Sequence, residues 1–376
     1  MDSIDEQASV IAARAERELS ALVAVSSPSG DREGAEEAVA VTSALLPDSA
    51  RIERLPCSSP GHADDLLATV EGDGTGRLLL LGHLDTVIGH DDHAPVRADG
   101  DRLVGPGTID MKGGDALALG VLRALAGQPE LYAEIALLLV VDEEWRTAPF
   151  VHAERFAGFD ACLCFEAGEL DAEGREAVVV RRKAAATIEV EAHGLSAHSG
   201  ANPDAGRNAL LALAAVAQQL AAFHDPQGPG RLSVVPTILT AGEALNVVPG
   251  HGTMTLDLRA DDERAFDAVL AAVPQELDGV HLDGRQGRLW PGMDAREAAA
   301  PVLATASGLA GLEIVPADRG GASDASHFAA SIPVTIDGLG PRGGGSHAPD
   351  EHALRSSLEP RARVALALAL AILATA

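Results

Sequence analysis

Histidines and carboxylates recur at the ends of apolar runs and in glycine-rich loops of this 376-residue sequence. His83 and Asp85 directly follow the apolar run 78–81, and because they are two residues apart, both side chains point the same way on an extended chain. Such a pair can hold a metal ion on the imidazole while the carboxylate orients the ring from behind. A surface histidine beside an aspartate is the alternative.

Two further motifs are acidic. Asp110 lies between two glycine turns just before an expected helix, where a short carboxylate could bridge two cations or cap the helix. Asp142, Glu143 and Glu144 follow the apolar run 135–141. Adjacent acids at the exit of a buried strand repel each other unless a cation or proton lies between them. One glutamate can bind a metal while its neighbour acts as general base, although solvated loop acids are the alternative.

Two more candidate ligands complete the set. Glu166 follows the apolar run 161–165, and His347 follows three consecutive glycines, 343–345. Two histidines and at least three carboxylates, all nitrogen or oxygen donors, suit a pair of zinc ions. Because ligand sites gather at the carboxyl ends of strands in α/β domains, five such clusters together favour one metal site.

The elements that would position these groups follow an α/β pattern. The runs 78–81 and 135–141 do not alternate, which suits strands buried on both faces, and a helix is expected between them over 113–125. Strand, helix, strand is the order of an α/β domain whose sheet is covered by helices. Further helices are expected over 5–24, 31–45, 298–310 and 364–376, and a strand over 334–336.

The pattern changes in the middle of the chain. Alternating strands are expected over 187–192, 232–239 and 253–259, a further strand over 280–289, and helices over 203–223 and 263–273. The order β-α-β-β-α-β is a split βαβ unit that could fold alone. We therefore expect one domain built from 1–184 and 293–376, with 185–292 inserted as a second, α+β domain.

Composition excludes several partner classes. A net charge of −28 repels phosphate backbones and anionic lipids, so we expect no nucleic-acid or membrane partner. The acidic N-terminus 1–6 lacks the order of a signal peptide, and no apolar run reaches the roughly 18 residues of a membrane span. Cys57, Cys162 and Cys164 do not form a disulfide framework in a chain of this length. The pair Cys162 and Cys164 is interpreted as buried reduced thiols, with metal ligands as the alternative. A cytoplasmic location follows by elimination.

The five clusters appear in the order seen in a known family. From about Ser26 to Asp350 the chain resembles the zinc-dependent exopeptidases and deacylases that include glutamate carboxypeptidase, acetylornithine deacetylase and succinyl-diaminopimelate desuccinylase. The resemblance implies a mixed sheet sandwiched by helices and two Zn²⁺ ions, with Co²⁺ or Mn²⁺ as alternatives. It implies that His83 and Glu166 bind one ion, Asp110 bridges, Glu144 and His347 bind the other, Glu143 is the general base and Asp85 orients His83.

Residues of the inserted segment and one later loop also resemble this family, and most closely its glutamate carboxypeptidase branch. The resemblance implies that His198 stabilises the oxyanion, in its own or a partner's site, and that Asn246 and Arg259 hold the substrate carboxylate. A guanidinium fork suits a carboxylate, with a surface salt bridge as the alternative for Arg259. The backbone at Gly320 and Gly321 would contact the substrate, and the segment would be a lid through which two chains form a homodimer.

The expected function is hydrolysis of an amide or peptide bond next to a carboxylate, in a small acyl-amino-acid or peptide substrate. Deacylation of N-acyl amino acids is the alternative, and a non-catalytic metal-binding protein a remote one. A serine hydrolase is disfavoured because no Gly-x-Ser-x-Gly motif appears. Trp145 and Arg146 stand where the family has small residues, and we expect them to reshape the pocket.

Overall fold

The computed structural model describes residues 3–376, which form two compact units. Unit 1 extends to Arg181 and includes Met293–Arg319 and Ser323–Ala376, whereas unit 2 consists of Arg182–Gly292 and Gly320–Ala322. The boundaries expected from the sequence lay after residues 184 and 292. Met1 and Asp2, part of the acidic N-terminus discussed above, lie outside the described residues. Within residues 3–376, no helix combines the length and apolarity needed to cross a membrane.

The centre of unit 1 is a mixed six-stranded sheet, as predicted. Its order is β1 (Arg51–Leu55), β2 (Asp65–Glu71), β6 (Tyr132–Val140), β3 (Gly76–His83), β7 (Ala161–Cys164) and β19 (Val334–Ile336). β3, β6, β7 and β19 run parallel, whereas β1 and β2 pair antiparallel to their neighbours. Leu78 to Leu81 are completely buried, which is why this run does not alternate.

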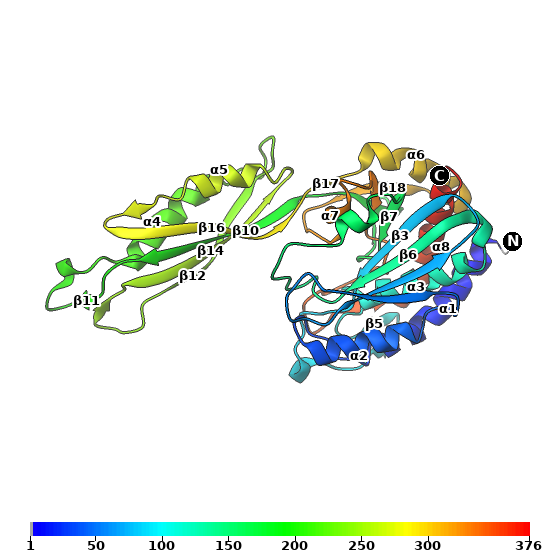
Figure 1. Cartoon of the computed structure of the whole chain (residues 1–376), viewed down its shortest axis with the longest axis horizontal. Helices are drawn as coiled ribbons and strands as arrows, with labels where there is room; N and C mark the ends of the chain where they lie inside the picture. The colour runs from blue at the N-terminus through cyan, green and yellow to red at the C-terminus, as the bar shows by residue number, and fades with distance from the viewer. Residues whose placement is uncertain (1–2) are drawn as a thin grey trace. The chain divides into compact units, whose positions relative to one another are not determined.

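Helices cover one face of this sheet (Figure 1). They are α1 (Ile4–Val23), α2 (Arg32–Ser43), α3 (Lys112–Ala126), α6 (Arg296–Ala310) and α8 (Leu358–Leu373). Leu78 and Leu80 belong to this core, whereas Leu79 and Leu81 pack on the opposite face with α7 (Ala325–Phe328) and the 3₁₀ turn η3 (Ala153–Phe156). All five helices occupy the ranges expected from the sequence to within a few residues, except that α8 begins earlier.

Two small sheets complete unit 1. One contains β17 (Met293–Asp294), β9 (Glu176–Arg182), β18 (Ile314–Arg319) and β8 (Glu169–Leu170). The other contains β20 (Gly343–Gly344), β21 (His352–Leu354), β5 (Arg102–Val104) and β4 (Arg97–Asp99). The second sheet carries the glycine loop of His347 at one end, so it fixes where that loop begins and ends.

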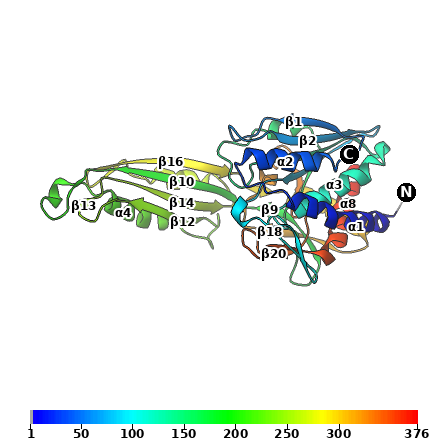
Figure 2. The same cartoon turned by 90° about the horizontal axis from the view of Figure 1, so that it is seen from below.

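Unit 2 has the predicted β-α-β-β-α-β order. Its sheet runs β12 (Ser233–Ala241), β14 (His251–Ala260), β10 (Ala184–His193), β16 (Val280–Trp290) and β15 (Glu276–Leu277). The first four lie side by side in Figure 2. The helices α4 (Ala209–Ala221) and α5 (Ala265–Ala271) share one core with the inward side chains of the sheet. A short pair, β11 (Ala197–His198) and β13 (Val247–Val248), lies outside this sheet.

One predicted helix begins later than expected. The sequence predicted a helix over 203–223, a range that includes Gly206, Arg207 and Asn208, whereas α4 begins at Ala209. The Asn208 side chain caps α4, and the Arg207 backbone pairs with Leu195 instead of continuing the helix. The prediction was wrong because asparagine favours the position before a helix and glycine favours non-helical backbone.

Candidate metal centre

Three predicted ligand segments leave neighbouring strands at the same edge of the unit 1 sheet. His83 is the last residue of β3, while Glu144 follows β6 and Glu166 follows β7. β3 pairs in parallel with both β6 and β7. Because the carboxyl ends of parallel neighbours open at one edge, the loops that carry these side chains meet there.

The buried imidazole of His83 has carboxylates beside both ring nitrogens. Nδ1 lies 3.3 Å from Asp85 Oδ1, and Nε2 lies 3.2 Å from Asp110 Oδ1 and 3.8 Å from Glu166 Oε1. A proton on Nδ1, donated to Asp85, leaves the Nε2 lone pair facing the other two carboxylates. The ring is therefore oriented from behind by Asp85.

Asp85 also holds the acidic loop after β6. Its two oxygens accept hydrogen bonds from the backbone N–H groups of Glu143 at 3.2 Å and Glu144 at 3.0 Å. Burial raises the pKa of Glu143 well above its ordinary value. A carboxylate with a raised pKa is a stronger base than an exposed one, so Glu143 is suited to accept a proton.

Asp110 faces two different histidines with its two oxygens. Oδ1 lies 3.2 Å from His83 Nε2, and Oδ2 lies 3.3 Å from His347 Nε2. Glu144 Oε1 approaches the same nitrogen of His347 to 3.1 Å. One ligand atom each from His83, Asp110 and Glu144 lie within 4.8 Å of one another. A carboxylate between two imidazoles is an arrangement that can bridge two cations.

The electrostatics of this cluster favour positive charge at its centre. Burial lowers the pKa of His83, but hydrogen bonds to Asp110 and Asp85 outweigh burial and leave the pKa well above its usual value. Hydrogen bonds to Asp110 and Glu144 raise the pKa of His347 to about 10. Nitrogen and oxygen donors at this spacing, without sulfur, fit zinc, which would supply the positive charge that the carboxylates attract.

The loop that carries His347 depends on its glycines. Gly345 has a φ of +77°, and His347 itself has a φ of +64°. A Cβ on Gly343 would lie 2.0 Å from the backbone oxygen of His352, so only glycine fits there. The three glycines noted in the sequence therefore let β20 approach β21 closely and turn the chain back at His347.

Glu351 is a residue to which sequence reasoning gave no role. Its Oε1 accepts hydrogen bonds from the backbone N–H groups of Ile109 at 3.0 Å and Asp110 at 3.1 Å. Burial raises its pKa to about 7. Glu351 lies four residues after His347, so it ties the loop of one predicted ligand to the loop of another. Its closeness in sequence to His347 was the signal that could have indicated a role for Glu351.

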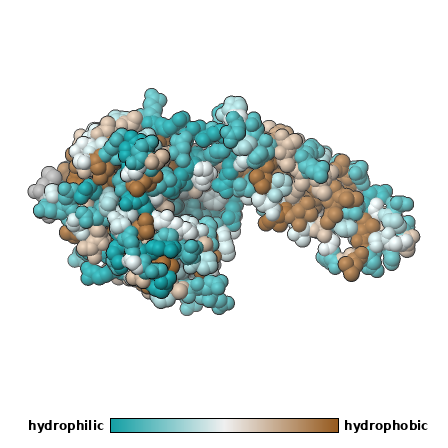
Figure 3. Space-filling model, turned by 180° about the vertical axis from the view of Figure 1, so that it is seen from behind, coloured by the Kyte–Doolittle hydropathy of each residue, from teal (hydrophilic) through white to brown (hydrophobic). Residues whose placement is uncertain are grey.

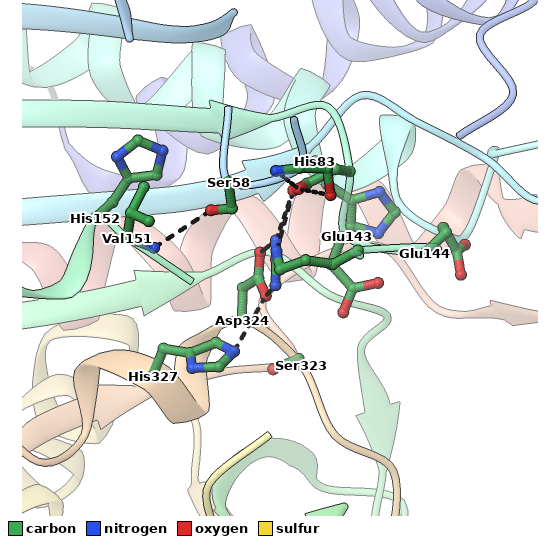
Figure 4. A network of polar contacts seen from close by, with 12 residues as sticks. Ser58, His83, Glu143, Glu144, Val151, His152, Ser323, Asp324 and His327 are labelled. Carbon is green, nitrogen blue, oxygen red and sulfur yellow. Dashed lines mark hydrogen bonds and ion pairs between the residues drawn. The ribbon is translucent and has the colours of Figure 1, made fainter. Parts of the chain in front are cut away.

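A buried ion network beside the cluster was also missed. Arg146 donates to Asp324 Oδ2 at 2.6 Å and to Asp142 Oδ1 at 2.9 Å, and Figure 4 shows Asp324 between His327 and the acidic pair that follows β6. The guanidinium is 3% exposed and is neutralised by two carboxylates, whereas Trp145 is about half exposed, at 49%. Arg146 and Asp324 are 178 positions apart, and no sequence pattern links them.

The predicted substrate residues of unit 2 form two groups. His198 and Asn246 lie together, because β11 pairs with β13 and the Ser199 N–H donates to the backbone carbonyl oxygen of Asn246 at 2.9 Å. His198 Nδ1 accepts two backbone N–H groups, at 3.2 and 3.1 Å. Arg259, at the far end of β14, forms a two-pronged ion pair with Asp257, at 2.9 and 3.0 Å.

The glycine pair Gly320 and Gly321 also belongs to unit 2, although it comes from a later part of the chain. The Gly321 oxygen accepts a hydrogen bond from Arg182 Nη1 at 2.7 Å. Nothing lies within 4 Å of a Cβ built on Gly320. The backbone of this loop is therefore open at Gly320 and anchored to Arg182 at Gly321.

Comparison with known proteins shows the family to which this chain belongs. The model of peptidase family M20/M25/M40 matches residues 79–371. Carboxypeptidase G2 from Pseudomonas sp. (strain RS-16) is 28% identical, covering 95% of this chain and 87% of its own. Succinyl-diaminopimelate desuccinylase from Afipia carboxidovorans is 30% identical, covering 64% of this chain and 67% of its own.

Solved structures agree on the fold. The aminopeptidase PepT from Bacillus cereus superimposes with a TM-score of 0.74 at 20% identity, covering 96% of this chain and 98% of that one. The matched range includes every side chain of the acidic and histidine cluster described above, from His83 to His347. The chain therefore belongs to peptidase family M20/M25/M40 and is a metal-dependent hydrolase.

Proposed function

We propose that this chain is a di-zinc hydrolase that cleaves an amide or peptide bond next to a free carboxylate, as a glutamate carboxypeptidase does. The observation that carries the proposal is the position of Asp110, whose two oxygens face His83 and His347 separately. Similarity to carboxypeptidase G2 over 95% of the chain supports the reaction class. Co²⁺ and Mn²⁺ take similar donors and are the alternative metals.

The proposed ligands divide around Asp110. His83 and Glu166 hold one ion and Glu144 and His347 the other, with Asp110 shared. Bound zinc supplies Lewis acidity, which makes water acidic enough to react near neutral pH and polarises a carbonyl. Three of these five side chains lie at the carboxyl ends of β3, β6 and β7, so the sheet edge itself sets their spacing.

The protein's own groups then move the protons. We assign Glu143 as the general base, which takes a proton from the attacking water and passes it to the leaving amine. Asp85 keeps Glu143 and His83 in place through the contacts described above. His198 accepts backbone N–H groups at Nδ1, so in its neutral form the proton is on Nε2, ready to donate to an oxyanion.

Asn246 and Arg259 are the proposed partners of the substrate carboxylate, with the backbone at Gly320 and Gly321 beside them. A guanidinium that already forms a fork with a carboxylate, as Arg259 does with Asp257, has the geometry to bind another. Binding of a terminal carboxylate by Asn246 and Arg259 would restrict cleavage to the bond at that end of the substrate. The ion pair with Asp257 also keeps the surface salt bridge open as the alternative role of Arg259.

We further propose that unit 2 is a lid through which two chains form a homodimer. His198 is next to the start of β14, whereas Arg259 is near its end, eight strand residues or roughly 26 Å from His251. A small substrate cannot touch both residues of one chain. The simplest arrangement is a site that takes Arg259 from one chain and both His198 and Asn246 from the partner subunit.

The surface of unit 2 supports this pairing. Val235, Ile238 and Leu239 are exposed on β12, which is an edge strand, and Leu211 is exposed on α4. Figure 3 shows apolar side chains gathered over this part of the chain. An apolar edge strand is a surface that another strand can cover. In this arrangement unit 1 would be the catalytic domain.

The cytoplasmic location expected from the sequence stays a prediction.

Deacylation of N-acyl amino acids is the second candidate. It is favoured by the desuccinylase that is 30% identical to this chain. Both reactions use the same metal cluster and break the same kind of bond, so the geometry of the ligands does not separate them. The exposed Trp145 beside the acidic loop gives this chain a side chain that can select among acyl groups.

A substrate panel on zinc-loaded full-length protein tests the proposal. Dipeptides and other amides that end in glutamate are compared with N-acetyl and N-succinyl amino acids, each with its α-carboxylate free or amidated. We expect cleavage of glutamate amides, loss of cleavage on amidation, and reversible loss with a chelator. Preference for N-acetyl or N-succinyl substrates would favour deacylation, and protein that binds no divalent ion would contradict both.

A further inference from the structure

Three histidines lie side by side across the sheet of unit 2. His193, the last residue of β10, is in register with His251 on β14 and with His281 on β16. β10 runs between the two other strands (Figure 2). Because adjacent strands are about 4.8 Å apart, side chains in register on one face must lie close together. The ring centroids are 5.5 Å apart for His193 and His251, and 6.3 Å apart for His193 and His281.

This row lies on the face of the sheet away from the helices. Val190 and Ala192 are buried in the core with α4, so Glu191 and His193 point to the opposite face. The side chains of Glu191 and His193 are 48% and 45% exposed, and that of His251 is 58% exposed. The imidazoles therefore contribute little to the core and are accessible to ions in solution.

Carboxylates flank the row and the ring nitrogens point at them. Glu191 Oε1 lies 2.9 Å from His251 Nε2 and 3.5 Å from His193 Nε2. Asp283 approaches His193 Nε2 to 3.7 Å and His281 Nε2 to 3.3 Å. One ligand atom each from Glu191, His193 and His251 lie within 4.8 Å of one another. Two imidazole nitrogens therefore converge on one carboxylate oxygen.

We propose that Glu191, His193 and His251 bind a zinc ion on the outer face of unit 2, at a site that shares no residue with the metal cluster of unit 1. Two imidazoles and a carboxylate are a donor set that zinc accepts, with Asp283 or water in the fourth position. The net charge of −28 raises the local concentration of cations. Because the ligands come from β10 and β14, the ion joins two adjacent strands and stabilises unit 2.

Zinc content of the full chain tests this site. Wild type and the double variant His193→Asn/His251→Asn are stripped with a chelator, dialysed against micromolar zinc and measured by elemental analysis. We expect the double variant to hold about one zinc ion fewer per chain, since two of three ligands are lost. The same difference is expected in a His83→Ala background, which separates this site from the cluster of unit 1 and from any failure of the proposed function.

Two controls make the result specific. His224→Asn changes another histidine of unit 2, which lies outside the row and accepts a hydrogen bond from the Val234 N–H. We expect its zinc content to equal that of wild type. Glu191→Gln keeps the shape of the site but weakens a ligand, and we expect weaker zinc binding with an unchanged circular dichroism spectrum. Equal zinc in wild type and the double variant, or equal loss in His224→Asn, would overturn the proposal.

Discussion

Single residues in the metal cluster act through charge. The carboxylates of Asp110 and Glu144 lie so close to each other and to His83 that they require positive charge between them, supplied by protons or by metal ions. Asp85 lies beside Nδ1 of the His83 ring, and Glu351 accepts a hydrogen bond from the backbone N–H of Asp110. These contacts fix where the proposed ligands His83 and Asp110 point. Substitutions at this scale should therefore separate chemistry from metal binding.

Glu143→Gln should remove turnover without removing zinc. The amide keeps the shape of the side chain but cannot accept the proton, and loss of a general base costs at least about a hundredfold in rate. Steady-state kinetics and elemental analysis of the same preparation measure both effects. Glu130→Gln, at an exposed position of unit 1, is the matched control and should leave both unchanged. Retained activity in Glu143→Gln would refute the assignment of the base.

Arg146→Met should destabilise the fold strongly. The change leaves Asp142 and Asp324 buried without their cation, and breaking such a buried pair costs roughly 3–5 kcal/mol. Chemical denaturation monitored by circular dichroism measures the loss. Arg285→Met removes an exposed, solvent-screened ion pair with Glu189 and should leave the free energy of unfolding nearly unchanged. Equal effects of the two changes would mean that the network around Arg146 contributes nothing.

Elements set the position of each proposed ligand by simple rules. The parallel strands β3, β6 and β7 open their loops at one edge, whereas His347 depends on the short pair β20 and β21. The end of a buried strand accepts many side chains. The hairpin of β20 and β21 does not, because the backbones of its two strands approach each other closely at Gly343 and His352. The hairpin is therefore the element most sensitive to one added methyl group.

Gly343→Ala should displace His347, whereas Gly344→Ala should not. The added Cβ at Gly343 would lie 2.0 Å from the His352 oxygen, while at Gly344 its nearest neighbour is His352 Cε1 at 3.6 Å. Overpacking of this kind costs roughly 1–3 kcal/mol. Thermal unfolding and zinc titration compare the two variants. If Gly344→Ala weakens zinc binding as much as Gly343→Ala, the close approach of the two backbones is not the cause.

At the scale of the whole molecule, the separation of His198 from Arg259 along β14 is the feature that calls for a second chain. A variant with a defect in unit 1 and one with a defect in unit 2 should then complement each other. Mixed dimers of Glu143→Gln and His198→Ala chains contain one site in which both changes coincide and one site that is intact. We expect each variant alone to be nearly inactive.

Random exchange of subunits in an equal mixture should restore about a quarter of the wild-type sites. Activity is measured after the chains are co-refolded or co-expressed, and light scattering gives the mass of the particle. A mixture of Glu143→Gln with His347→Ala, whose changes both lie in unit 1, is the control and should stay inactive. Absence of recovery in the first mixture would mean that His198 acts within its own chain.

Much of this protein could be predicted from its sequence because the signals are local. Fully apolar runs give strands buried on both faces, as at Leu78 to Leu81, and alternation gives half-buried strands, as in β10. The same local reading picked out the histidines and carboxylates that gather at the sheet edge, and their role as metal ligands stays a prediction. The start of α4 was not predicted correctly, because the helical pattern of the sequence extends across Asn208, whose side chain caps the helix at that position.

What only the tertiary structure decided is which distant groups meet. The sequence alone determined the order of the elements, the two-part organisation of the chain and the types of donor in the cluster. It did not determine that Arg146 is neutralised by Asp324, or that histidines on three strands of unit 2 form one row. Register and burial set those contacts, and both arise from packing across the whole chain instead of from any short segment.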